Sequence, residues 1–431
     1  MILTTIKVAR HPYEAMAAAR ERYGDPFYLP MANGKIVATA RPELIKLLLT
    51  NREAELFGPF AFEATQALLG THSVLMMGGA EHKRERKLLT PAFHGERMRA
   101  YGAQMIAATR AAFAMLEPGD EFVAIEHTTR VSLEAIVRAV FGFDDAAGVA
   151  RFSAAIKATL DAAVPMILFS PKTQVAPFGL GPWARYQARS AEADALIYEQ
   201  IERTRGNTEG REDILSLLLD ARYEDGSQMS DSDIRDELRT LLIAGHETTA
   251  VSLAWALYAL HADPEVLERA RAEVDALGPD PAPDALARIP YLNALIDETL
   301  RLYPIVDVFF RRLLRPWSFA GYELPAGVCL CPAIVLVHRD PELYPDPERF
   351  DPERFMGRKP RPHEYLPFGG GNRRCIGAAF SHYESRLALA TLLREFELEL
   401  REPPGGIEAA RRSVTMGPKT GVRMRVRARR G

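Results

Sequence analysis

The chain has 431 residues, of which 47% are hydrophobic and 26% are charged, which is typical of an ordinary soluble globular protein. This composition excludes intrinsic disorder, collagen and small disulfide-rich scaffolds. The 54 Lys and Arg residues nearly balance the 57 Asp and Glu residues and leave a net charge of −3, so we expect no general attraction to nucleic acid or to an anionic membrane.

Targeting and membrane signals are missing from the sequence. The first ten residues, MILTTIKVAR, hold too few apolar positions for a signal peptide, and no apolar run approaches the length of a membrane span. The three cysteines, Cys329, Cys331 and Cys375, are too few for a disulfide framework and suit a reducing compartment. We therefore expect a cytoplasmic protein with no membrane anchor. No repeat or linker divides the chain, so residues 1–431 are expected to form one domain.

The first predicted element is a β-hairpin, because Asn33-Gly34 lies between two apolar runs near residues 25–40. Most of the following chain has helical spacing of Ala, Leu, Glu and Arg. The predicted helices cover residues 80–116, 127–142, 183–204, 211–220, 263–275, 291–303 and 378–395.

The longest predicted helix begins near Ser230, where Ser230 and Asp233 resemble a capping box, and continues without proline to Pro264. Short β-rich pieces follow near 315–336 and near the C-terminus, and residues 337–374 form a predicted irregular loop rich in Pro, Asp, Gly and Arg. The elements predict a mainly α fold with a small β-rich lobe near 25–40 and 315–336.

Cys375 is the first candidate for chemistry, because it precedes a predicted helix in the segment FGGGNRRCIGAAF, residues 368–380. Free backbone N–H groups at the start of that helix, together with Arg373 and Arg374, would favour a thiolate, which is a soft metal ligand or a nucleophile. The alternative is a buried structural cysteine. Cys329 and Cys331 have no partner of metal-ligand spacing nearby and are expected to be plain strand residues.

This segment resembles the haem-binding signature of the cytochrome P-450 family. Phe368, Gly371, Arg373, Cys375 and Gly377 fill each fixed position of that signature. The resemblance implies the cytochrome P-450 fold, a triangular-prism helical domain, with haem b bound and Cys375 as the thiolate ligand of its iron. It also implies that Phe368, Gly369 and Gly377 lie against the haem.

The segment AGHETT, Ala244 to Thr249, lies inside the long predicted helix and places a glycine and two threonines in a helix interior. One interpretation is a close helix contact through small residues. The family resemblance implies instead an oxygen-activating groove that includes Ala244, in which Gly245 leaves room over the iron, Thr248 hydrogen-bonds dioxygen there and Glu247 supplies protons as an acid.

Glu298 and Arg301 stand three residues apart in ETLR, a spacing that by itself indicates a surface ion pair. The resemblance implies a buried structural network that includes an arginine before the cysteine loop. The sequence DPERF occurs twice, so this arginine is Arg354 or, as the alternative, Arg349.

Candidate partners for the haem propionates come from three segments. His82 and Arg86 stand four apart in EHKRERKLL, where a solvated basic face is the alternative. Many family members have Trp at the place of His82, but histidine keeps donor capacity. Arg311, with neighbouring Arg312 as an alternative, and Arg373 complete the set.

The assembled resemblance implies a monooxygenase that inserts one oxygen atom from O₂ into a lipophilic small molecule by hydroxylation or epoxidation. The chain holds no flavin or iron–sulfur segment, so electrons from NAD(P)H are expected to arrive through a ferredoxin or flavodoxin with its reductase. Lys83, Arg84, Lys87 and Arg374 form the candidate docking face, with a merely solvated surface as the alternative. We expect a monomer that binds no nucleic acid.

Two rival functions stay open. A peroxide-dependent or isomerising haem-thiolate enzyme would not need Glu247 and Thr248, and a haem-thiolate sensor or binding protein would show no turnover. The resemblance also gives candidate pocket walls, with ordinary core packing as the alternative for each. They lie at 57–77, 165–180, Leu241 and Ala244, Ile305 to Phe310, and Thr415 with Met416, including Phe60, Phe62, Leu168, Phe169, Val306 and Phe309. Asp307 among them is expected to pair with an arginine.

Overall fold

The computed structural model describes residues 2–31, 34–51, 56–59, 65–143, 145–164, 167, 171–403, 406–412 and 414–430. Its α-helices are α1 Ile2–Arg10, α2 Pro12–Tyr23, α3 Pro42–Thr50, α4 Gln66–Leu69, α5 Gly79–Leu89, α6 Glu96–Phe113, α7 Ala124–Phe141, α8 Ala146–Ala162, α10 Pro182–Thr204, α11 Ile214–Asp220, α12 Asp231–Ala262, α13 Pro264–Asp275, α14 Pro283–Ala287, α15 Pro290–Leu302, α16 Ile334–Val337 and α17 Ala378–Glu395.

Short strands and single turns of 3₁₀ helix complete the secondary structure. The strands are β1 Phe27–Met31, β2 Gly34–Thr39, β3 Glu121–Val123, β4 Arg311–Arg312, β5 Trp317–Phe319, β6 Tyr322–Leu324, β7 Cys329–Pro332, β8 Phe396–Leu400, β9 Ala409–Arg412, β10 Thr415–Pro418 and β11 Arg423–Arg429. The 3₁₀ turns are η2 Thr90–Phe93, η3 Pro171–Thr173, η4 Pro177–Gly179, η5 Pro352–Phe355 and η6 Gly371–Arg373.

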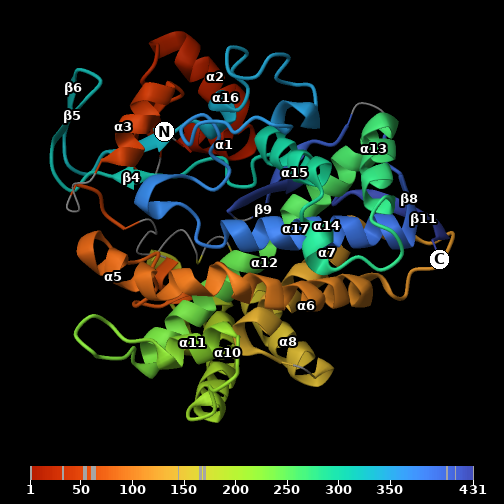
Figure 1. Cartoon of the computed structure of the whole chain (residues 1–431). Coiled ribbons are helices and arrows are strands. Elements are labelled where there is room, and N and C mark those ends of the chain that lie inside the picture. The colour runs from red at the N-terminus through yellow and green to blue at the C-terminus, as the bar shows by residue number, and fades with distance from the viewer. Residues whose placement is uncertain are drawn as a thin grey trace.

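The predicted long helix is confirmed as α12. Its 32 residues give a length of about 48 Å at the rise of an α-helix. The Ser230 side chain accepts from the backbone N–H of Asp233, and the Asp233 carboxylate accepts from the Ser230 N–H, which is the predicted capping box. Helix α12 lies near the centre of the molecule and contacts α7, α17, α15 and β10 (Figure 1).

The largest sheet confirms the predicted β-rich lobe, because its order β1-β2-β7-β4 joins residues 27–39 to residues 311–332. β1 and β2 form the predicted antiparallel hairpin, in which Met31 pairs with Gly34, whereas Asn33 lies outside the described residues. β2 runs parallel to β7. Cys329 and Cys331 are buried free cysteines in β7, as predicted.

The N-terminal helices and this sheet occupy one end of the molecule, and α8, α10 and α11 occupy the opposite end (Figure 1). Between them, α12, α7, α6, α15 and α17 contribute most of the largest cluster of buried apolar side chains. The fold therefore has a helical core with a small β lobe at its edge, as the sequence predicted.

One predicted helix range was wrong, and several helices were missed. The range 80–116 is not one helix, because Pro91 and Gly95 separate α5 from α6: Pro91 has no N–H to donate, and Gly95 has a φ of 70°. Helix α8 was missed, although the Asp145 side chain caps it by accepting from the Gly148 N–H at 2.6 Å. The N-terminal helices α1 to α3 were missed as well.

Length and hydropathy rule out a membrane-crossing role for each helix in the described part of the chain.

Candidate active site

The loop that carries Cys375 closes on itself just before α17. The Cys375 N–H donates to the Phe368 carbonyl at 2.9 Å, and Gly377 is the N-cap of the helix. The glycines of this loop are needed for close contact with α3: a Cβ on Gly370 would lie 2.5 Å from the Leu49 side chain, and one on Gly371 would lie 2.2 Å from the Leu49 carbonyl. The close packing of the loop against α3 therefore requires glycine at these two positions.

The remaining signature residues lie around the sulfur. A Cβ on Gly377 would be 4.0 Å from Cys375 Sγ, and one on Gly369, whose φ is 65°, would be 3.8 Å from the Phe309 ring. The Phe368 ring packs on His382 with centroids 5.1 Å apart. Gly377 therefore lies directly beside the candidate ligand, while Gly369 and Phe368 support the loop.

The pKa of the Cys375 thiol is raised, whereas the sequence predicted a stabilised thiolate. Backbone N–H groups of Gly377 and Ala378 and the charges of Arg86 and Arg374 do lower the pKa of the thiol, but burial raises it more, so the pKa lies above its ordinary value. The residue as a whole is nevertheless exposed, although its thiol lies deep enough for burial to dominate its pKa. A metal cation deprotonates a coordinating thiol outright.

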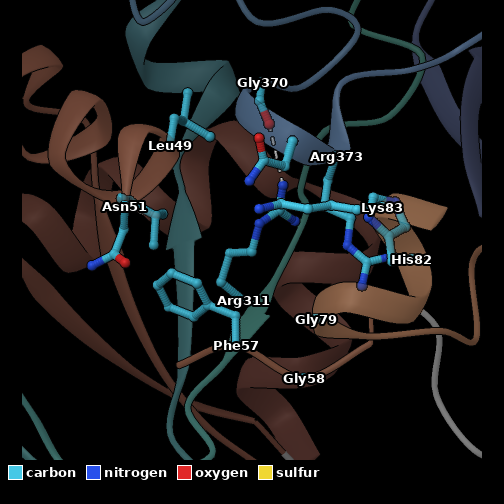
Figure 2. Close-up of a pocket in the computed structure, with 12 residues that line it drawn as sticks. Leu49, Asn51, Phe57, Gly58, Gly79, His82, Lys83, Arg311, Gly370 and Arg373 are labelled. Atoms are coloured by element: carbon cyan, nitrogen blue, oxygen red, sulfur yellow. Dashed lines mark hydrogen bonds between the residues drawn. The ribbon is translucent and has the colours of Figure 1, made fainter. Parts of the chain in front are cut away.

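A cavity of about 60 Å³ beside this loop is surrounded by cationic side chains (Figure 2). His82, Lys83, Arg311 and Arg373 line it, and Arg311 points across it toward the Gly370 carbonyl at 3.4 Å. Arg311 Nη1 also donates to the Phe310 carbonyl at 3.1 Å. Burial, together with the neighbouring positive charge, lowers the pKa of Arg311 and that of Arg373 to about 10.

The other two predicted donors lie on α5. His82 is buried, and burial together with the charges of the three arginines lowers its pKa to about 4, so His82 is neutral at pH 7 and acts only as a hydrogen-bonding group. Arg86 is half-buried one turn later. Within the described ranges, no carboxylate pairs with Arg86, Arg311 or Arg373.

The chemistry of these groups fits haem. Arg311 and Arg373 line a partly open cavity and have no carboxylate partner in the described structure, which suits an anionic ligand, and their planar forks match the two carboxylates of haem. A cysteine at the start of a helix suits its iron. Cys375 would hold the metal, and Arg86, Arg311, Arg373 and His82 would hold the propionates.

Helix α12 presents two of the predicted groups to open space. Ala244 is exposed although the helix turns around it are largely buried. The Thr248 hydroxyl donates to the Ala244 carbonyl at 2.8 Å. Because its proton is committed to that carbonyl, Thr248 offers its Oγ1 lone pairs as an acceptor.

Gly245 has a different role from the one predicted. Its missing side chain faces α7, where a Cβ would lie 3.1 Å from the Ile136 side chain, and its carbonyl accepts from Ser132 at 3.4 Å. Gly245 therefore makes the close helix contact that was the alternative interpretation of this segment, and its role beside the iron stays a prediction. Glu247 points toward β10, where its Oε1 accepts from the Thr415 hydroxyl at 3.2 Å.

Glu298 and Arg301 form a fully buried pair. Arg301 Nε donates to Glu298 Oε2 at 2.6 Å and Nη2 donates to Oε1 at 2.8 Å, so the surface interpretation is wrong. The partner arginine is Arg354, whose Nε lies 3.3 Å from Glu298 Oε1. Arg349 contributes only its backbone carbonyl, which accepts from Arg301 at 3.3 Å.

His338 extends this network to the cysteine loop and was missed by the sequence analysis. Its carbonyl accepts from Arg301 at 2.7 Å, and its Nε2 accepts from the Leu366 N–H at 2.9 Å, two residues before Phe368. Burial, with the charge of Arg301, lowers the pKa of His338 to about 3, so the ring stays neutral. A lone histidine before a proline-rich loop carries no sequence signal for this role.

Glu384 on α17 was also missed. It is fully buried, and Ser132 is the hydrogen-bonding side chain that acts on its carboxyl group, lowering its pKa less than burial raises it. Burial raises its pKa to about 8, so the carboxyl group is neutral at pH 7. Its position in the apolar stripe of a predicted helix, one turn after Phe380, was a signal that could have been used.

The candidate docking face and pocket walls are only partly as expected. Lys87 pairs with Glu224 at 2.7 Å and Arg84 with Asp225 at 2.9 Å, so two of the four basic residues already have acidic neighbours. Asp307 pairs with Arg411 at 2.6 Å, as predicted. Phe309 is buried in the packing beneath Gly369. Phe60, Phe62, Leu168 and Phe169 lie outside the described residues.

Comparison with known proteins gives consistent matches over nearly the whole chain. A family model described as Cytochrome P450 matches residues 1–422. The chain is 36% identical to cytochrome P450 135B1 of Mycobacterium tuberculosis over 99% of its own length and 89% of that protein. It is 35% identical to cytochrome P450 138 of the same organism, over 95% and 90% of the two chains.

Solved structures of similar fold agree with these sequence matches. The retinoic acid-bound cyanobacterial CYP120A1 superposes with a TM-score of 0.86 at 25% identity, covering 98% of this chain and 95% of that one. The cytochrome P450DA heme domain also gives a TM-score of 0.86, at 27% identity, covering 99% and 95%.

Proposed function

Because this chain belongs to the cytochrome P450 family, and is therefore a haem-dependent oxidoreductase of the monooxygenase type, we propose that it hydroxylates or epoxidises a lipophilic small molecule with electrons from a separate redox partner. The haem iron supplies the binding and activation of O₂. The observation that carries the proposal is that the loop holding Cys375 also lines a cavity at which Arg311 and Arg373 have no carboxylate partner in the described structure.

The side chains of this protein are proposed to bind, orient and protonate. Arg86, Arg311 and Arg373 hold the propionates by charge-assisted hydrogen bonds, and neutral His82 adds a further hydrogen-bonding group. Thr248 accepts a hydrogen bond at the reacting side of α12. Glu247, whose pKa is raised by burial, is the acid that passes a proton toward Thr248 through water.

The presence of an acid, Glu247, next to an alcohol, Thr248, favours a monooxygenase that uses O₂ over a peroxide-dependent enzyme, an isomerising enzyme or a sensor. Those functions require no delivery of protons from the protein, and Glu247 together with Thr248 has no evident use in them. A lipophilic substrate is proposed because the candidate walls on α12 and after α15 are mainly apolar, and because the similar CYP120A1 binds retinoic acid.

Electrons are proposed to come from NAD(P)H through a ferredoxin or flavodoxin. Arg374 and Lys83 are the exposed cations of the candidate face with no ion pair in the described structure. The pairs of Arg84 and Lys87 are exposed and screened by solvent, so an acidic partner can replace their present carboxylates at small cost.

The experiment compares Thr248→Ala with Thr249→Ala. A panel of fatty acids, terpenes and steroids is first screened by haem spin-state shift, and the strongest responder is turned over with a plant-type ferredoxin and its NADPH-dependent reductase. T248A is expected to divert most electrons to hydrogen peroxide. T249A is expected to keep its coupling, because the Thr249 hydroxyl faces α17, where it donates to Ser381 at 3.2 Å. Unchanged coupling in T248A would refute the proton-delivery role.

A further inference from the structure

The hydrogen bond between Thr415 and Glu247 joins the proposed acid to an element far away in the sequence. Thr415 opens β10 and is completely buried. Its hydroxyl lies 3.2 Å from Glu247 Oε1 and 3.1 Å from the Arg412 carbonyl on the neighbouring strand β9. The hydroxyl therefore has two acceptors within reach but only one proton to donate.

The hairpin that presents Thr415 is fixed in place. β9 and β10 pair antiparallel with Thr415 opposite Arg412. The Met416 N–H donates to the Ile305 carbonyl at 2.8 Å, and the Met416 carbonyl accepts from the indole of Trp255 on α12 at 3.3 Å. Trp255 lies two helical turns after Glu247, so the hairpin is tied to the helix that carries the acid.

The two acceptors allow the Thr415 hydroxyl to serve both protonation states of Glu247. When Glu247 is ionised, the hydroxyl donates to its carboxylate. When Glu247 is protonated, the acid donates to Thr415 Oγ1, and the hydroxyl proton turns to the Arg412 carbonyl. The carboxyl group thus keeps a partner while it gains and loses a proton, which limits the cost of moving charge in a buried site.

The charges around Glu247 support this arrangement. Burial raises the pKa of Glu247, whereas the hydrogen bond from Thr415 and the positive charge of Arg412 on β9 lower it. Arg412 is the charged group that acts on Glu247 from the elements packed against this part of α12 in the described structure. Loss of the Thr415 hydroxyl is therefore expected to raise the pKa of Glu247 further.

We propose that Thr415 is a positioning residue for proton delivery, which holds the Glu247 carboxyl group in one place through its protonation and deprotonation. The proposal rests on the proposed function of Glu247. It assigns to the β9–β10 hairpin a part in the reaction rather than only in enclosing the substrate.

The experiment uses the haem-loaded enzyme and the probe compound chosen by the spin-state screen. Thr415→Val keeps the shape of the side chain without its hydroxyl, and Thr415→Ser restores the hydroxyl. Thr420→Val is the matched control, because Thr420 is exposed and also donates to a glutamate, but to Glu402 at 2.7 Å rather than to Glu247. Glu247→Gln and the double variant E247Q/T415V complete the set.

T415V is expected to bind the probe with an affinity within about twofold of the parent, and to form product about tenfold more slowly, as expected for one hydrogen bond to an ionised group. The alkaline limb of its pH–rate profile is expected to move to higher pH, because Glu247 must be protonated to act and holds its proton more tightly. T415S should restore both properties, and T420V should change neither. In the E247Q background, T415V should add no further loss.

The outcomes separate this inference from the proposed function. If E247Q itself forms product at the parent rate, the proposed role of Glu247 fails. If E247Q is slow but T415V is not, or if T415V slows the E247Q variant by the same factor as the parent, Thr415 does not act through Glu247 and the inference alone is overturned. A slow T415V whose pH profile is unmoved also overturns it.

Discussion

Replacement of Glu298 by alanine tests the link between the buried ion-pair network and the haem site. Glu298 accepts from Arg301 twice, from the Asp351 N–H at 2.8 Å and from Arg354 at 3.3 Å, and both side chains of the central pair are fully buried. E298A leaves the Arg301 charge without its counter-charge. Because Arg301 also donates to the His338 carbonyl, and His338 accepts from Leu366, the loss is expected to reach the cysteine loop.

The expected cost follows from the burial of the pair. Removal of one partner of a buried ion pair destabilises a protein by about 3–5 kcal/mol. Unfolding entropy of about 2.1 cal/mol/K per residue gives a chain of 431 residues roughly 0.9 kcal/mol/K, so the thermal midpoint should fall by about 3–6 °C. Haem should also be lost from the variant during purification.

The assay is thermal unfolding together with the carbon monoxide difference spectrum of the reduced enzyme. Glu134→Ala is the matched control, because Glu134 also pairs with an arginine, Arg138 at 2.8 Å on α7, but both side chains are partly exposed, at 22% and 14%. E134A should shift the midpoint by about 1 °C or less. If E298A melts within 1 °C of the parent and keeps its haem, the buried network does not support the cysteine loop.

Three further predictions concern the haem site and the core beneath it. Cys375→Ser should keep the helical circular dichroism but lose the red-shifted carbon monoxide band of thiolate ligation, and a variant that keeps this band would exclude Cys375 as the ligand. Arg311→Gln should speed haem transfer to apomyoglobin by about tenfold, because one charge-assisted contact to a propionate is lost. Arg312→Gln, at an exposed position, should leave the transfer rate unchanged. Equal transfer rates in the two variants would contradict the assignment of Arg311 over Arg312. Glu384 binds a proton in the folded state up to about pH 8 but only to about 4.5 when unfolded, so stability is lost as pH rises between these values, by about 1.4 kcal/mol per unit. Between pH 5 and pH 7.5 the free energy of unfolding should fall by about 3 kcal/mol, and Glu384→Gln should remove this loss. If the thermal midpoint depends on pH in the same way in the parent and in E384Q, Glu384 does not bind the proton in the folded state.

Elements whose signals lie within a few neighbouring residues could be predicted from the amino-acid sequence. The capping box at Ser230, the proline-free run to Pro264 and the alternation around Asn33-Gly34 predicted α12 and the first hairpin, because caps, helical periodicity and turn residues act within a few positions. The cysteine signature was also local, since its residues share one loop. Pro91 and Gly95 are local helix-breaking signals as well, so the sequence could also have predicted the end of α5 and the start of α6.

Which side chains pair with one another follows from how distant elements pack in the folded chain. Whether Arg349 or Arg354 completes the Glu298 network depends on which copy of DPERF packs against α15. Whether Gly245 serves a ligand or α7 depends on the rotation of α12 about its axis. Thr415 and His338 acquire their roles from elements far away in sequence, and a pattern within one segment carries no information about which distant group will lie within hydrogen-bonding distance.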